Sequence, residues 1–205
     1  MLPFNKASVV GKELEYIAET IKLGWISGDG PFAKRCEAFL ESQMGESSKV
    51  FLTPSCTDAL EMCAMLLNLK AGDEVIVPSY TFVTTALAFT HQGARPVFAD
   101  IDPIDLNICP DSVERLITKN TKAVVVVHYG GVACDMARLH SICRSHKILL
   151  IEDAAHALGG SYNKQPLGSI GDLATLSFHE TKNVTCGEGG ALVVNSAELV
   201  NRAQV

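Results

Sequence analysis

Ser177-Phe-His-Glu-Thr-Lys-Asn183 stands at the end of an apolar, strand-like stretch, Leu173 to Phe178. A glycine-rich turn, Gly187-Glu-Gly-Gly190, follows, and it predicts that the next strand-like segment, Ala191–Asn195, returns antiparallel to the first. A single lysine at the end of a strand, Lys182, beside a serine and a histidine is better suited to covalent capture of an aldehyde than to a salt bridge. Most lysines are solvated loop residues, so the neighbours of this one carry the argument.

Outside this stretch, short β-branched runs alternate with helical stretches from Lys49 onward, for example Val75–Val77, Ala123–Val127 and Ile148–Ile151. Continuous apolar strands separated by helices are typical of a parallel sheet with helices on both faces. We therefore predict an α/β fold built on a mainly parallel, doubly covered sheet. A chain of 205 residues, 47% of them hydrophobic, is long enough for one such core.

Two amphipathic helices are expected before the sheet, one around Leu14 to Ile21 and one over Phe32 to Met44. This pattern predicts an N-terminal helical segment over residues 1–48 and a large sheet-containing domain over residues 49–205. A last helix is expected near Ala197 to Val205.

Three polar segments follow predicted strands: Pro54–Asp58, Asp153–His156 and Ser177–Lys182. Ligands of parallel sheets gather beyond the carboxyl ends of the strands. Although the three segments lie far apart in the sequence, we expect them to form one site.

Thr53-Pro-Ser-Cys-Thr-Asp-Ala59 joins a strand to an apolar helix. The free N–H groups of the helix start, with the hydroxyls of Ser55 and Thr57, could hold a phosphate group. An ordinary capping box between Ser55 and Asp58 is the alternative. Because the Asp58 carboxylate would repel phosphate, its backbone N–H is the better candidate contact.

Asp153 ends the run Ile151-Glu-Asp153. A carboxylate facing a pyridinium nitrogen and a lysine that captures an aldehyde are the two groups that pyridoxal phosphate chemistry needs. A helix cap is the alternative role for Asp153. His156, three residues on, either contacts the cofactor ring or is simply packed.

Two aromatic residues follow other strands. Phe82, in Pro78-Ser-Tyr-Thr-Phe82, is expected to start a helix and either stacks on the cofactor ring or belongs to the core. Tyr129, in His128-Tyr-Gly-Gly131, either lines the substrate side or packs with its hydroxyl paired, and the sequence leaves this open.

Composition limits the other functions. The net charge of −6 and the absence of a basic run argue against a nucleic-acid partner. The seven cysteines are odd in number and scattered, so we expect reduced thiols in a cytoplasm and no metal site. Met1 to Lys6 lacks the layout of a signal peptide, and no apolar run approaches the ~20 residues of a membrane span.

Taken together in their order, Thr53–Thr57, Pro78–Phe82, Val127–Gly131, Glu152–His156 and Ser177–Asn183 resemble the DegT/DnrJ/EryC1/StrS sugar aminotransferase family. The resemblance runs from about Pro3 to the end of the chain. It implies the large domain of a fold-type-I pyridoxal phosphate transferase, with a seven-stranded, mainly parallel sheet. The sequence around Lys182 is most similar to that of the dTDP-4-dehydro-6-deoxyglucose aminotransferase branch.

The resemblance also implies residue roles. Lys182 would be the lysine bonded to the cofactor, and Asp153 the partner of the pyridine nitrogen. Thr57, the Asp58 backbone and Ser177 would hold the phosphate. Phe82 would stack on the ring, with His156 close by.

The implied reaction moves an amino group from glutamate to the C4 ketone of a dTDP-linked deoxysugar, for surface polysaccharide synthesis in a homodimer. Amination at C3 of another nucleotide-linked ketosugar is a rival reaction. Members of the family are longer than 205 residues, so the resemblance implies that the C-terminal small domain is absent. A catalytically silent cofactor-binding or interaction protein is therefore a second alternative.

Overall fold

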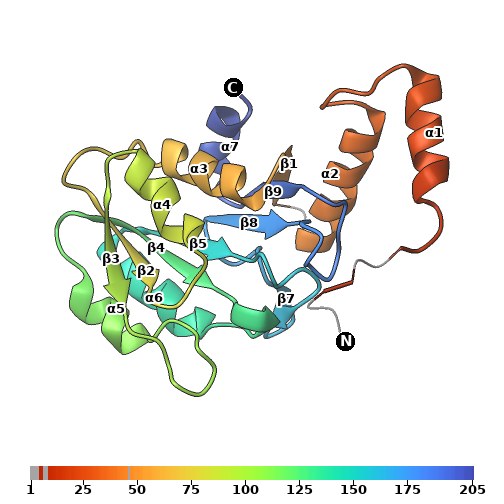
Figure 1. Cartoon of the computed structure of the whole chain (residues 1–205). Helices are drawn as coiled ribbons and strands as arrows, with labels where there is room; N and C mark the ends of the chain where they lie inside the picture. The colour runs from red at the N-terminus through yellow and green to blue at the C-terminus, as the bar shows by residue number, and fades with distance from the viewer. Residues whose placement is uncertain (1–4, 7–8, 46) are drawn as a thin grey trace.

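The computed structural model describes residues 5–6, 9–45 and 47–205 (Figure 1). Residues 1–4, which carry most of the prediction about a leader sequence, lie outside the described residues. The helices are α1 Glu13–Leu23, α2 Pro31–Met44, α3 Cys56–Leu66, α4 Thr84–His91, α5 Pro110–Leu116, the 3₁₀ turn η1 Tyr129–Gly131, α6 Met136–His146 and α7 Ala197–Ala203. The strands are β1 Lys49–Thr53, β2 Glu74–Pro78, β3 Arg95–Ala99, β4 Thr121–Val127, β5 Leu149–Asp153, β6 Ser161–Tyr162, β7 Gln165–Pro166, β8 Leu173–Ser177 and β9 Gly190–Val194.

Seven strands form one sheet in the order β1-β9-β8-β5-β4-β2-β3. The pairs from β8 through β5, β4 and β2 to β3 are parallel, whereas β9 is antiparallel to both of its neighbours. The predicted mainly parallel, seven-stranded sheet is thus confirmed. The predicted return of the chain after the glycine-rich turn is confirmed as well, although a loop over residues 178–189 separates β8 from β9.

Helices cover both faces of the sheet, as predicted (Figure 1). On one face α3, α4 and α7 bury the side chains that alternate along the strands, such as Val75, Val125 and Ile151. On the other face α5 and α6 cover Val124 and Leu150, while α2 covers the β8–β9 side of the sheet. Every residue of β2, β8 and β9 is buried, which explains their continuous apolar runs.

Local signals set the helix ends. Ser55 caps α3 by accepting the Asp58 N–H, and Asp135 caps α6 by accepting the Arg138 N–H. Helix α1 ends at Leu23, and the next residue, Gly24, has a φ of 72°, a left-handed conformation that glycine adopts without strain.

Two local predictions were wrong. Phe82 does not start a helix, because α4 begins at Thr84 and Phe82 lies in the preceding turn, where its carbonyl accepts the Thr85 N–H. No helix follows Asp153, so the cap alternative is wrong: residues 155–159 form a turn. Sequence reasoning did not identify β3 or the small hairpin of β6 and β7.

The two helices expected before the sheet are present, and only α2 buries side chains, Leu40 and Met44, against it. The division of the chain at residues 48 and 49 into two domains stays a prediction. Within the part of the chain that the structure describes, every helix is too short or too polar to span a bilayer.

Candidate active site

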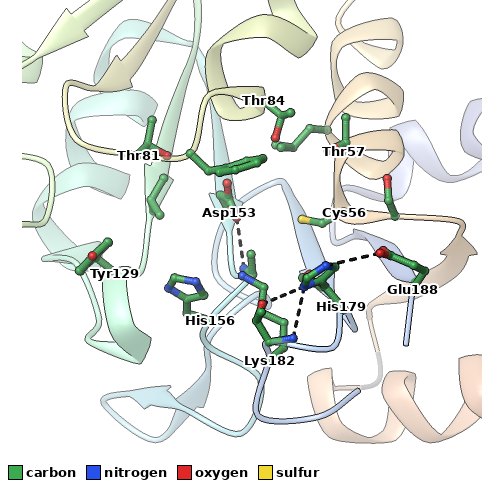
Figure 2. Close-up of a pocket in the computed structure, with 18 of the residues that line it drawn as sticks. Cys56, Thr57, Thr81, Thr84, Tyr129, Asp153, His156, His179, Lys182 and Glu188 are labelled. Carbon is green, nitrogen blue, oxygen red and sulfur yellow. Dashed lines mark hydrogen bonds and ion pairs between the residues drawn. The ribbon is translucent and has the colours of Figure 1, made fainter. Parts of the chain in front are cut away.

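A cavity of about 650 Å³ opens beyond the carboxyl ends of β4, β5 and β8, against the N-terminus of α3 (Figure 2). It brings together the three segments that the sequence predicted to converge. Its lining consists of Ser55, Cys56, Thr57, Leu60, Tyr80, Thr81, Phe82, Thr84, Val127, Tyr129, Asp153, Ala155, His156, Ser177, His179, Thr181, Lys182, Glu188 and Gly189.

Strand alternation directs Asp153 into this cavity. Asp153 lies two residues beyond Ile151, whose side chain packs in the core under α3 and α4, so both side chains lie on that face of the sheet. The Asp153 carboxylate is 5% exposed and accepts hydrogen bonds from Thr85 Oγ1 at 2.9 Å and from the Ala155 N–H at 3.2 Å. Burial raises the pKa of Asp153, although these hydrogen bonds and the charge of Lys182 oppose the shift.

Lys182 comes from the loop between β8 and β9. The loop folds back on itself, since the Phe178 N–H donates to the Gly189 carbonyl at 2.8 Å and the Lys182 N–H donates to the His179 carbonyl at 2.9 Å. Figure 2 shows Lys182 in the same cavity as Asp153 and His156. The half-buried lysine therefore reaches the cavity from a segment that backbone bonds hold in place.

The N-terminus of α3 forms a third wall. The N–H groups of Cys56 and Thr57 have no acceptor within the helix, because they occupy its first turn. Gly190 permits the close approach of β9, since a Cβ there would lie 2.4 Å from the Cys56 nitrogen. The Cys56 thiol is neutral, because burial first and the Asp153 charge second raise its pKa to about 12.

Asp58 is the one predicted site residue that does not line the cavity. Its N–H donates to Ser55 Oγ at 3.1 Å, and Ser55 Oγ donates to the Asp58 carboxylate at 2.8 Å. The capping contact that was the alternative explanation is therefore present, and it occupies the N–H that we had expected to face phosphate. The predicted residues Thr57, Phe82, Asp153, His156, Ser177 and Lys182 all line the cavity.

His156 lies in the turn after β5, with Tyr129 on one side of it (Figure 2). Its Nδ1 accepts the Gly130 N–H at 3.3 Å, so in the neutral ring the proton sits on Nε2. Desolvation and the positive charge of Lys182 lower the pKa of His156, while Asp153 opposes the shift. The imidazole is thus held neutral near neutral pH.

Sequence reasoning missed several residues of the lining. His179 and Glu188 lie 3.4 Å apart between Nε2 and Oε1 across the 178–189 loop. Tyr80, Thr81 and Thr84 follow β2. Their position just beyond the carboxyl end of a parallel strand is the sequence signal that identifies them, because ligands of such sheets bind there.

No group of three or more metal-ligating side chains is present among residues 5–6, 9–45 and 47–205. The chemistry of the cavity is that of an amine, a buried acid, hydroxyl groups and a helix N-terminus.

The sequence pattern of the DegT/DnrJ/EryC1/StrS aminotransferase family matches residues 8–205. The chain is 40% identical over 204 residues to the spore coat polysaccharide biosynthesis protein SpsC of Bacillus subtilis (strain 168), covering 100% of this chain and 52% of that protein. It is 38% identical over 205 residues to GDP-perosamine synthase of Vibrio cholerae, covering 98% of this chain and 55% of that protein. The chain thus spans about half the length of these relatives.

Solved structures share the fold. The aminotransferase TlmJ from Streptoalloteichus hindustanus matches with a TM-score of 0.94 and 36% identity over 100% of this chain and 56% of that one. DesI, solved in the presence of its TDP-sugar product, matches with a TM-score of 0.88 and 36% identity over 98% of this chain and 50% of its own. The PLP form of Spr1654 from Streptococcus pneumoniae matches with a TM-score of 0.89 and 31% identity over 99% and 55% of the two chains.

Proposed function

Because this chain belongs to the DegT/DnrJ/EryC1/StrS aminotransferase family, we propose that it supplies the cofactor-binding half of a nucleotide-sugar aminotransferase. The proposed reaction takes an amino group from glutamate and transfers it to the C4 ketone of a dTDP-4-dehydro-6-deoxy sugar. The product would enter surface polysaccharide synthesis, and the enzyme would work as a homodimer in the cytoplasm. One observation carries the proposal: Lys182, Asp153 and the start of α3 border a single cavity.

Pyridoxal phosphate is the cofactor of this family, and one neighbour was solved in its PLP form. The cavity fits this cofactor. Asp153 is a buried carboxylate that makes no ion pair with any described residue, and a protonated ring nitrogen supplies the positive charge that it lacks. Thr175, beside Asp153 in the sheet, carries the one buried side-chain oxygen or nitrogen of the described residues without a hydrogen-bond partner.

Four groups would hold the cofactor. The free N–H groups at the start of α3, with the hydroxyls of Thr57 and Ser177, suit a phosphate. Phe82 is 72% exposed at the cavity and has a ring face free for stacking. Asp153 would bind the ring nitrogen, and Lys182 would bond to the aldehyde carbon.

When bound, pyridoxal phosphate supplies an aldehyde carbon and an electron-accepting ring. Asp153 would keep the ring nitrogen protonated, because a buried carboxylate is stabilised by an adjacent positive charge. Lys182 Nζ would take the proton from the α-carbon of the donor amino acid and later deliver a proton to the sugar carbon. Neutral His156 can donate a hydrogen bond from Nε2 without adding a charge near Lys182.

The names of two relatives bear on the substrate. DesI was solved with a TDP-sugar product, and GDP-perosamine synthase carries a GDP-linked sugar in its name. We propose a dTDP carrier because of the DesI structure and because the sequence around Lys182 resembles the dTDP-4-dehydro-6-deoxyglucose aminotransferase branch. A panel of dTDP-, GDP- and UDP-linked 4-ketosugars and 3-ketosugars, each with glutamate, tests both the carrier and the position.

The first test is borohydride trapping. Reduction should fix the cofactor covalently to the peptide that contains Lys182, and mass spectrometry should locate it there. Lys182→Ala should reduce the trapped fraction to background, because no other described lysine lines the cavity. Lys119→Ala, a change to an exposed lysine outside the cavity, should trap as well as the native protein.

Undiminished trapping in Lys182→Ala would contradict the assignment of the lysine. Trapping without amination of any ketosugar in the panel would favour the silent cofactor-binding alternative.

A further inference from the structure

Two tyrosines from different strand ends form a hydrogen-bonded pair at the cavity. The hydroxyls of Tyr80, after β2, and Tyr129, after β4, lie 2.8 Å apart, and their ring centroids are 4.8 Å apart at 49°. The Tyr129 ring in turn meets the His156 ring edge-on, with centroids 5.9 Å apart. The three rings thus make a continuous aromatic wall, Tyr80-Tyr129-His156, in the lining of the cavity. Figure 2 shows Tyr129 and His156 on the side of the cavity away from α3.

Buried polar side chains fix the turn that presents Tyr129. Asn107, 3% exposed, accepts the Tyr129 N–H at 3.2 Å and donates to the Val132 carbonyl at 3.1 Å. These two bonds hold the turn at both ends. Gly130 and Gly131 make the turn possible with φ of 60° and 82°.

A buried pair of side chains, His128 and Glu152, also stabilises this turn. His128 and Glu152 are both fully buried, with Nε2 and Oε2 2.9 Å apart. The Cys134 N–H donates to His128 Nδ1 at 3.3 Å, so the Nε2 proton is donated to the carboxylate. Glu152 also accepts the N–H groups of Gly168, Ile170 and Gly171. Tyr129 is therefore held on a rigid base, although neither buried group reaches the cavity.

Resting on the function proposed above, we propose that the Tyr80-Tyr129 pair determines specificity for the sugar ring of the substrate. The rigid base supports this, because a surface that positions a ligand must itself be immobile. Neither tyrosine is among the groups proposed to hold the cofactor, although Tyr129 contacts the His156 ring.

The chemistry of the pair suits a pyranose. In an O–H···O pair one hydroxyl donates to the other, which leaves one proton and several lone pairs for sugar hydroxyls. The ring faces offer apolar area to the C–H face of the sugar. The pair stays uncharged near neutral pH, since its hydrogen bond raises the pKa of Tyr129.

The test uses the cofactor-loaded protein and the variants Tyr80→Phe, Tyr129→Phe and the double variant. Each single change should raise the KM for the ketosugar by about threefold to tenfold, the effect of one neutral hydrogen bond. The dissociation constant of the nucleotide-sugar product, measured by calorimetry, should rise by a similar factor. Because the hydroxyls act as a unit, the double variant should lose less than the product of the two single losses.

Three readouts should not move: the borohydride-trapped fraction, the half-reaction with glutamate, and the KM for glutamate. Tyr162→Phe is the matched control, since its hydroxyl contacts Asp135 at 3.3 Å outside this cavity. Unchanged sugar KM and product affinity in both single variants would overturn the proposal. An equal loss in the glutamate half-reaction would also overturn it, because the pair would then serve the cofactor. A native protein that traps no cofactor would instead refute the proposed function, and this proposal with it.

Discussion

Asp153 shows how a single residue can be unfavourable for folding and suited to function. The chain buries its carboxylate beside Thr85 and the Ala155 N–H, without a cationic partner in an ion pair among the described residues. Burial of a charge without a paired cation destabilises the folded state, and here it raises the pKa of the carboxyl group. A ligand with a protonated ring nitrogen would remove this penalty, which supports the cofactor role that we propose for Asp153.

Asp153→Asn should therefore stabilise the cofactor-free protein. When a carboxyl group has a higher pKa in the folded than in the unfolded state, the protein keeps its full stability below the unfolded-state pKa. The protein then loses stability as pH rises through the folded-state pKa. The variant should have a higher Tm than the native protein at pH 8, and the difference should vanish as pH falls below the carboxyl pKa values.

Calorimetric melting of both proteins from pH 3 to pH 8 checks this. A variant that is less stable than the native protein at pH 8 would show that the carboxylate contributes net stabilising contacts. Cofactor retention should fall in the same variant, because the amide cannot balance a pyridinium charge.

At the scale of elements, the site depends on how closely β9 approaches the start of α3. Gly190 opens β9 beside Ser55 and Cys56, and its missing side chain lets the two backbones meet. The same contact fixes the N–H groups that we propose for phosphate. Strand β9 therefore needs a glycine at position 190, because any side chain there would collide with the start of α3.

Gly190→Ala should destabilise the protein by about 1 to 3 kcal/mol, because the new Cβ would clash with the Cys56 nitrogen and force α3 to shift. Cofactor affinity should fall with it. Gly28→Ala is the matched control, since a Cβ there meets nothing within 4 Å. Urea unfolding and spectroscopic cofactor titration measure the two effects. Equal stability of Gly190→Ala and the native protein would show that the sheet absorbs the extra methyl group without moving the helix.

At the scale of the whole molecule, packing is uneven. The sheet is buried between its helix layers, whereas α1 contributes no buried residue and meets α2 through Tyr16 and Phe32, whose ring centroids lie 5.6 Å apart. In Figure 1, α1 stands beyond α2 at the edge of the molecule. Stability is therefore concentrated in the sheet.

Hydrogen exchange should reflect this difference. Amides of α1 should exchange faster than those of β4 and β5 by a factor on the order of a thousand or more, because opening α1 exposes little apolar surface. Exchange followed by mass spectrometry at low protein concentration measures it. Protection of α1 equal to that of β5 would mean that another surface covers this helix in solution.

The amino-acid sequence determined the parallel sheet, because buried strands and amphipathic helices differ in the spacing of their apolar residues. It also placed Asp153 at the end of a strand and Lys182 in the segment that follows one, since local order along the chain fixes which residues end a strand and which come after it. The use of the Asp58 N–H, the closeness of Gly190 to Cys56 and the pairing of Tyr80 with Tyr129 were decided only by the tertiary structure. Each of these depends on which elements become neighbours and how near they come, and packing of segments distant in the chain sets both.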